Sequence, residues 1–377
     1  MMETPPLSLY VHFPWCVRKC PYCDFNSHPA KGPLPEAAYV AQLLRDLDHD
    51  VALVGNRSIE TIFIGGGTPS LISGRSIAAL LDGIRSRIVV APDAEITLEA
   101  NPGAIDAENF ADYLVAGVNR LSIGAQSFNA DLLKRLGRTH TPSDTKGAIA
   151  TAIGAGFARI NLDLMHGLPG QTVDDAVADL RCAIALGVSH ISWYQLTIEA
   201  RTEFAAHPPQ LPDEDSLDAI EGAGLAFLAS AGLRRYEVSA FSRAGQEARH
   251  NLNYWMFGDY LGIGAGAHGK ISFPARGTVI RTNKPLAPTR YLAASSIELR
   301  SEAVVNAEAL PGEFLLNALR LIDGVTESLF NARTGCASAT IDARWRHQQV
   351  HGLMRNDRLG VTPLGLRHLD TVVSDFL

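Results

Sequence analysis

Short apolar runs alternate with amphipathic segments along the first two hundred positions of this 377-residue chain. Between positions 172 and 186, for example, apolar residues recur at helical spacing, and Asp174, Asp175 and Asp179 lie between them. Acidic residues in the first turn suit the dipole of a helix N-terminus. Such alternation is typical of βαβ units and a mostly parallel sheet. The predicted buried strands cover residues 7–13, 61–64, 95–99, 120–123, 159–164 and 191–196.

Six consecutive strand and helix units predict a parallel (β/α) barrel, partial or complete, more than an open doubly wound sheet. In such barrels the loops after the C-terminal ends of the strands form the active face. A cysteine run follows the first predicted strand, and the segment Gly-Gly-Gly-Thr-Pro at 65–69 follows the second. Glu99 ends the third strand, Gln126 follows the fourth, and Asp163 lies near the end of the fifth. We therefore expect these polar candidates to meet at one rim.

The pattern changes after residue 311. A helical segment at 313–321 is followed by a loop-rich stretch and a final pattern over residues 358–376. Two helices, a short hairpin and a terminal helix would suit a small winged-helix-like unit, which need not bind DNA. The predicted division is a barrel domain at 1–240, a connecting region at 241–310 and an accessory domain at 311–377.

Composition and charge narrow the class of protein. The chain is 46% hydrophobic and 19% charged, as in ordinary globular proteins. Its net charge of −7 and the absence of long basic runs argue against a nucleic-acid partner. The first fifteen residues lack a signal peptide pattern, and no stretch approaches the length of a membrane span. We therefore expect a cytoplasmic protein with reduced thiols.

Three of the five cysteines form a C-x3-C-x2-C run made by Cys16, Cys20 and Cys23. By chance this spacing should occur in about one chain in a thousand of this composition. Three thiolates can hold three irons of a cubane and leave the fourth iron open to a small chelating molecule, such as S-adenosylmethionine. Zinc fits less well, because His12 and His28 do not complete a tetrahedral motif. A disulfide framework fails because the remaining cysteines are isolated and the count is odd.

Three other rim features each have a structural alternative. The glycine triplet could bring backbone groups close to a ligand amine, or it could simply make a tight turn, and the cysteine run one unit upstream favours the ligand role. Glu99 could accept hydrogen bonds from ribose hydroxyls or an amine, or it could be half of a buried ion pair. Asp163 could meet a ribose or pair with Arg138. The sequence leaves the alternatives for the two acids open.

The segment His-Asn-Leu-Asn-Tyr-Trp at 250–255 places one imidazole and two aromatic rings close together. Imidazole is a common axial ligand of haem iron, and Tyr254 and Trp255 could cover a porphyrin. On chemistry alone a structural role is favoured, because a lone histidine such as His250 is usually not a ligand.

The cysteine run, residues 65–69, Gly-Ala-Gln-Ser-Phe at 124–128 and Asp-Leu-Met-His-Gly-Leu-Pro-Gly-Gln-Thr at 163–172 together resemble radical S-adenosylmethionine proteins related to oxygen-independent coproporphyrinogen III oxidase. This resemblance covers nearly the whole chain. Within that family the chain is most similar to the haem-chaperone members. Phe25 stands where the oxidase has a further cysteine, and residues 250–255 match the H-N-x-x-Y-W motif of those chaperones.

The resemblance implies a haem chaperone that binds a 4Fe-4S cluster and S-adenosylmethionine and delivers haem to acceptors, including respiratory proteins. The alternative is an oxidase that decarboxylates porphyrinogen propionates, so the sequence leaves open whether the chain is an enzyme. Further expectations are a reductant for the cluster, a homodimer, peripheral membrane association, and Tyr22 and Phe25 packed near the cluster. The implied cluster ligands are Cys16, Cys20 and Cys23, the implied S-adenosylmethionine contacts are Tyr10, Gly66, Gly67, Thr68, Glu99, Gln126, Arg138 and Asp163, and the implied haem contact is His250.

Overall fold

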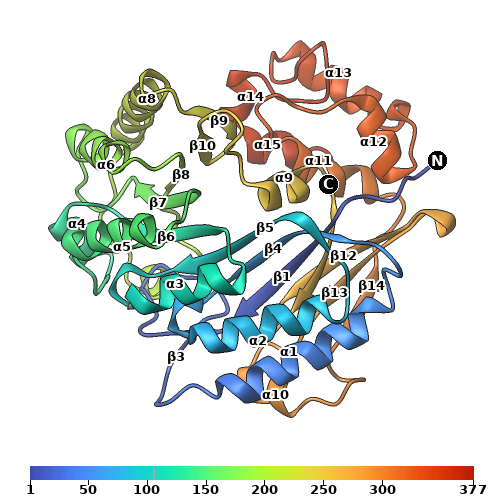
Figure 1. Ribbon diagram of the computed structural model, residues 1–377. Helices are drawn as coiled ribbons and strands as arrows, with labels where there is room; N and C mark the ends of the chain where they lie inside the picture. The colour runs from blue at the N-terminus through green and yellow to red at the C-terminus, as the bar shows by residue number, and fades with distance from the viewer. Residues whose placement is uncertain (105–106) are drawn as a thin grey trace.

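A computed structural model describes residues 1–104 and 107–377, and its main feature is one large curved sheet (Figure 1). The sheet has twelve strands in the order β14-β13-β12-β11-β1-β4-β5-β6-β7-β8-β10-β9. Its parallel part consists of β1 (Leu7–Phe13), β4 (Ile59–Gly66), β5 (Val90–Ala100), β6 (Arg120–Gln126), β7 (Ile160–His166), β8 (His190–Gln195) and β11 (Asp259–Ile263).

The sheet has two open edges, so the barrel is partial and not complete. One edge is built by β12 (His268–Phe273), β13 (Thr278–Asn283) and β14 (Ser301–Val304), and the other by β10 (Ala240–Ser242) and β9 (Arg234–Glu237). These strands pair antiparallel with their neighbours. The sequence pattern predicted six of the seven parallel strands, and it missed β11 and these antiparallel additions. Because the sheet continues across residue 240, the proposed domain boundaries stay a prediction.

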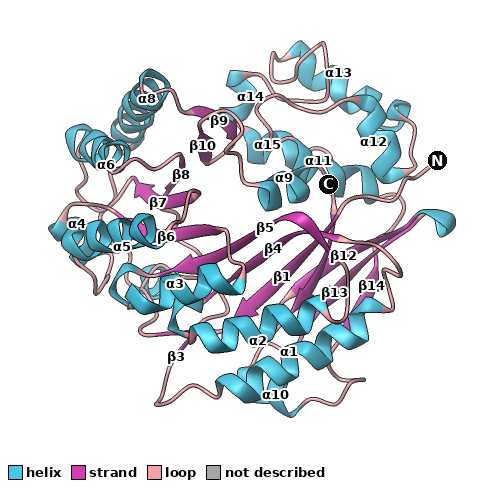
Figure 2. Ribbon diagram, in the orientation of Figure 1, coloured by secondary structure: helices cyan, strands magenta, loops and turns pink. Residues whose placement is uncertain are grey.

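Helices line the outside of the parallel strands (Figure 2). Neighbours pack along this outer layer, including α1 against α2, α2 against α3, α3 against α5 and α6 against α8. At the start of α6 (Val173–Ala185), Thr172 and Asp175 form a reciprocal capping box, in line with the acidic first turn predicted there. The other helices before the C-terminal unit are α1 (Glu36–Val51), α2 (Gly74–Arg85), α3 (Ala107–Ala116), α4 (Ala130–Arg135), α5 (Pro142–Ala155), α7 (Glu203–Ala206), α8 (Glu214–Ser230), α9 (Arg249–Trp255) and α10 (Pro288–Ala293).

The inner strands have two different faces. In β1, Leu7, Leu9 and Val11 are fully buried in the core beneath the helices. The alternate residues face the other way and are polar: the Ser8 hydroxyl, for example, lies 2.7 Å from that of Thr61. The concave side of the sheet therefore carries the chemistry.

The C-terminal unit has its own hydrophobic core, and it lies beside α9 (Figure 1). It contains α11 (Leu310–Ala318), α12 (Glu327–Thr334), α13 (Asp342–Val350), antiparallel bridges at Val325–Leu359 and Met354–Val361, α14 (Pro363–Arg367) and α15 (Leu369–Ser374). The predicted terminal helix is thus split in two. In the described ranges 1–104 and 107–377, no helix combines the length and apolar character needed to cross a bilayer.

Candidate functional site: a cysteine pocket at the strand ends

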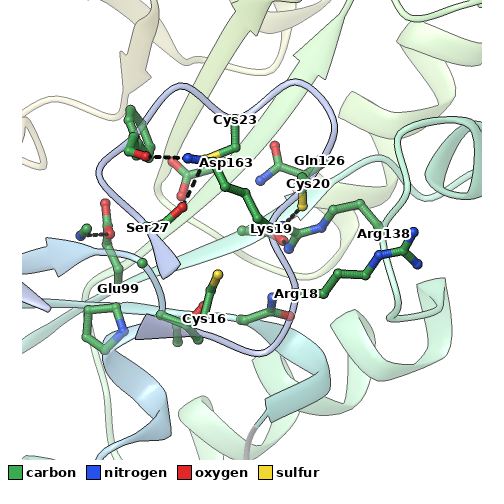
Figure 3. A pocket seen from close by; sticks show the side chains of 18 of the residues that line it. Cys16, Arg18, Lys19, Cys20, Cys23, Ser27, Glu99, Gln126, Arg138 and Asp163 are labelled. Carbon is green, nitrogen blue, oxygen red and sulfur yellow. Dashed lines mark hydrogen bonds between the residues drawn. The ribbon is translucent and has the colours of Figure 1, made fainter. Parts of the chain in front are cut away.

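A pocket of about 260 Å³ opens at the C-terminal ends of the inner strands (Figure 3). Ten of the twelve predicted site residues line it, and Tyr10 and His250 do not. The prediction that the polar candidates meet at one rim is therefore confirmed for the positions of these ten residues. The lining residues among the candidates are Cys16, Cys20, Cys23, Gly66, Gly67, Thr68, Glu99, Gln126, Arg138 and Asp163.

The three cysteines are free thiols in the segment between β1 and α1. Cys16 ends the short strand β2 (Trp15–Cys16), which pairs with β3 (His28–Pro29), and Cys20 and Cys23 lie on the loop between these two strands. A backbone hydrogen bond from Cys23 N–H to the Cys20 carbonyl, 3.0 Å, makes a tight turn in this loop. Polar groups stand next to two of the sulfurs: the Ser27 hydroxyl lies 3.5 Å from Cys23 Sγ, and an Arg138 N–H lies 3.6 Å from Cys20 Sγ. Such groups suit a thiolate-bound cluster, because hydrogen bonds to the sulfurs stabilise their charge.

Burial raises the pKa of the Cys16 thiol, so a cluster or a single metal ion would have to supply the energy for its deprotonation. One observation favours the cluster. Across residues 1–104 and 107–377, no group of three or more His, Cys, Asp or Glu side chains is arranged to hold one ion. A cubane instead presents a separate iron to each thiolate. The loop therefore fits a 4Fe-4S group held by Cys16, Cys20 and Cys23.

The glycine triplet lets two backbone segments approach each other closely. Gly66 has a φ of 120°, and a Cβ there would lie 2.6 Å from the His12 ring. A Cβ on Gly67 would lie 2.3 Å from the Trp15 carbonyl oxygen, where the cysteine loop begins. The Gly67 N–H donates to the Phe13 carbonyl at 2.6 Å. The triplet therefore makes a tight turn that forms one wall of the pocket, and its contact with a ligand stays a prediction.

Two carboxyl groups form the acidic side of the pocket. Glu99 accepts a hydrogen bond from the Gly66 N–H at 2.9 Å. Burial, and then the nearby Asp163 carboxylate, raise the pKa of Glu99 to about 8. Asp163 accepts hydrogen bonds from Ser122 Oγ at 2.9 Å and Asn161 Nδ2 at 2.7 Å. Neither acid pairs with a cation within the described part of the chain, so both structural ion-pair alternatives are wrong.

Arg138 and Gln126 are held in place from the side of the pocket. Arg138 donates to the Gly124 carbonyl at 2.9 Å and reaches Cys20 rather than Asp163. Gln126 has a φ of 66°, which is uncommon for a residue with a side chain. Its Oε1 accepts a hydrogen bond from the Tyr194 hydroxyl at 2.8 Å. Strained backbone of this kind gathers at functional sites.

A chain of buried hydrogen bonds leads from the pocket to α9. Asn161 Nδ2 donates to Asp163, and Asn161 Oδ1 lies 2.6 Å from His190 Nδ1. A carbonyl oxygen can only accept, so His190 carries its proton on Nδ1. The opposite nitrogen, Nε2, therefore accepts from the Tyr236 hydroxyl at 2.9 Å, and that oxygen in turn accepts from Asn251 Nδ2 at 3.2 Å. Burial lowers the pKa of His190 well below its ordinary value, which keeps this arrangement neutral.

The structure places His250 away from the pocket. It lies on α9 with only 5% of its surface exposed, and Phe63 stacks on its ring at 4.3 Å between centroids. Its Nδ1 is 2.8 Å from Glu95 Oε1, and Arg159 lies 3.1 Å from the other oxygen of that carboxylate. Burial alone would raise the pKa of Glu95, but the hydrogen bond and charge of His250 outweigh it and lower the pKa to about 2. The haem contact assigned to His250 stays a prediction that would require α9 to open.

Tyr10 also lies outside the pocket. Its ring stacks on Phe63, and its hydroxyl lies 2.7 Å from His12 Nδ1. The expectation that Tyr22 and Phe25 shield the cluster is half correct. Tyr22 is partly buried and contacts Phe204, whereas Phe25 is 60% exposed and does not limit solvent access. Phe25 still lines the pocket mouth.

Ser27, Ser122 and Tyr194 line the pocket and were not predicted. A signal existed for two of them. Ser122 lies two positions before Gly124 on the same strand face, and Tyr194 lies near the C-terminal end of the sixth strand. Ser27 lies in the irregular part of the cysteine loop, where no periodicity operates.

The fold and the cysteine pocket define a radical S-adenosylmethionine protein, and residues 10–183 match the model of the Radical SAM superfamily. Three bacterial relatives named Heme chaperone HemW align over the whole chain. The protein of Escherichia coli is 49% identical and that of Haemophilus influenzae 47%, with 100% and 99% of those chains covered. The protein of Mycobacterium tuberculosis is 36% identical over 96% of its length. The chain belongs to the HemW family.

One solved structure shares the fold closely. Coproporphyrinogen III oxidase (HemN) from Escherichia coli, described as a radical SAM enzyme, superimposes with a TM-score of 0.84. The match covers 99% of this chain and 90% of that chain at 22% identity. This likeness confirms the predicted radical SAM barrel with its C-terminal unit.

Proposed function

We propose that this chain is a haem chaperone, which binds haem and delivers it to acceptor proteins. The observation that carries this proposal is the full-length similarity of 36 to 49% to relatives named as haem chaperones. The oxidase alternative is not favoured, because the solved oxidase is only 22% identical and its likeness concerns the fold.

The pocket supports binding of a 4Fe-4S cluster and S-adenosylmethionine. Cys16, Cys20 and Cys23 would hold the cluster, which when bound supplies reducing electrons and an open iron. The Arg138 guanidinium would lie beside the thiolate of Cys20 and offset part of its charge. The glycine turn, the Glu99 carboxyl and the polar groups of Gln126 and Asp163 offer acceptors and donors to the rest of the ligand. That these residues contact S-adenosylmethionine is part of this proposal, and Tyr10, which stacks on Phe63, would contribute from outside the pocket.

Haem would be cargo, and its acceptors would be apo-haem proteins such as those of respiration. A reductant would supply the cluster. We also propose that the protein forms a homodimer and contacts a membrane peripherally. These partners follow from the family and from the reactivity of such clusters.

The test uses the full chain with its cluster reconstituted under anaerobic conditions. Haem is titrated and followed by absorbance, and the loaded protein is then mixed with an apo-haem protein. Saturable uptake followed by transfer supports the chaperone. Absence of uptake, together with conversion of coproporphyrinogen III to protoporphyrinogen, would establish the oxidase instead.

A further inference from the structure

The outer surface of the cysteine loop carries an unusual combination of side chains. Val17 is 54% exposed and Phe25 is 60% exposed, and both flank the cysteines. Arg18 and Lys19 lie on the same loop, are exposed, and line the mouth of the pocket together with Phe25. We call Val17, Arg18, Lys19 and Phe25 the loop face.

The apolar and cationic parts of the loop face are held side by side. Lys19 Nζ donates a hydrogen bond to the Phe25 carbonyl oxygen at 2.9 Å, which keeps the ammonium next to the phenylalanine backbone. Among the residues that the structure describes, no carboxylate lies within 4.0 Å of Arg18 or Lys19. Asp24 is the one acidic residue of the loop between Cys16 and Ser27. Two cations are thus available to an anionic partner.

This combination suits a flat apolar ring with carboxylates along one edge. An exposed phenylalanine offers a stacking surface for such a ring, and exposed cations pair with carboxylates. The surface is locally basic in a chain whose net charge is −7, so the match does not follow from the overall charge.

The position of His250 points the same way. Its imidazole is engaged by Glu95, and Phe63 covers one face of its ring. Haem could not reach it without displacing α9 from the sheet. The loop face, in contrast, is exposed at the pocket mouth and can accept a ligand without such a movement.

We propose that haem docks on the loop face, with the porphyrin stacked on Phe25 and its two propionates paired with Arg18 and Lys19. This inference rests on the proposed function and specifies its binding surface. It places the cargo directly over the cysteine pocket, where occupancy of the pocket can influence haem loading and release.

The test is an anaerobic titration of the cluster-loaded full chain with haem and with haem dimethyl ester, in which both propionates are neutral. Wild-type protein should bind the ester about tenfold more weakly than haem, and metal-free protoporphyrin IX should bind comparably to haem. This comparison needs no variant, so cluster assembly cannot confound it. Equal affinity for haem and its ester would overturn the pairing with Arg18 and Lys19.

Two variants locate the surface. Phe25→Ser and the double variant Arg18→Glu/Lys19→Glu should each weaken haem binding about tenfold. Matched controls on the exposed side of α13, Val350→Ser and Arg344→Glu/Arg346→Glu, should change it less than about twofold. Iron content and cluster absorbance show whether each variant retains its cluster.

The two proposals fail in different ways. If wild-type protein takes up haem and both loop variants bind it equally well, the docking surface is refuted and the chaperone stands. If wild-type protein takes up no haem at all, the proposed function fails and the docking surface with it.

Discussion

Replacing Glu99 with glutamine should stabilise the cluster-free protein at alkaline pH. Folding raises the pKa of this carboxyl from 4.5 to about 8, chiefly through burial. Between these values the native state binds more protons than the unfolded state, so the free energy of unfolding falls as pH rises. This loss of unfolding free energy is small near pH 4.5 and reaches its full size above pH 8. Glutamine carries no charge, so its burial causes no such pH-dependent loss of stability.

The magnitude follows from the shift in pKa. At about 1.4 kcal/mol per pKa unit, the full shift corresponds to about 5 kcal/mol as an upper bound. Solvent in the pocket reaches one side of Glu99, so we expect about 2 kcal/mol. Urea unfolding of wild type and Glu99→Gln at pH 5, 7 and 9 measures this difference, which should grow with pH. The exposed Glu308→Gln serves as a control and should show no such trend.

A difference that is the same at pH 5 and pH 9 would refute the reasoning, because only a titrating carboxyl produces the trend.

The raised pKa of Glu99 also has a consequence for ligand binding. A cationic ligand group beside Glu99 favours the ionised carboxylate, so its binding releases a proton. S-adenosylmethionine should therefore bind wild type more tightly at pH 8.5 than at pH 6, and Glu99→Gln should lose this dependence.

Further predictions concern the turn, the hydrogen-bond chain and α9. Gly66→Ala should destabilise the protein by more than about 2 kcal/mol in thermal unfolding, because its φ and the nearby His12 ring exclude a Cβ. Tyr236→Phe should cost about 1 to 2 kcal/mol in urea unfolding, since His190 and Asn251 lose their shared partner; an unchanged midpoint would contradict this. His250→Gln should keep saturable haem uptake, and its complete loss in a variant with an unchanged thermal midpoint would favour a haem contact by this imidazole.

The sequence by itself determined the repeated β and α units and the loop chemistry. Strands buried on both sides and helices with one apolar face have distinct periodicities, so the inner strands could be predicted from local pattern. The cysteine spacing is also local, because three ligands on one short loop need no distant partner. The rim location of Glu99 and Asp163 followed from their positions near the C-terminal ends of predicted parallel strands, which lie at one rim.

Only the tertiary structure decided which polar groups meet. Arg138 could equally have paired with Asp163, and the choice of Cys20 and Gly124 depends on how α4 and the following loop return to the sheet. Strands β9, β10, β11 and β14 were missed because they have only three to five residues, too few for a clear strand pattern. His250 lies beside Glu95, 155 positions away, and that long-range contact, rather than any local motif, buries its imidazole. Local periodicity carries no information about such contacts, which arise when packing brings remote side chains together.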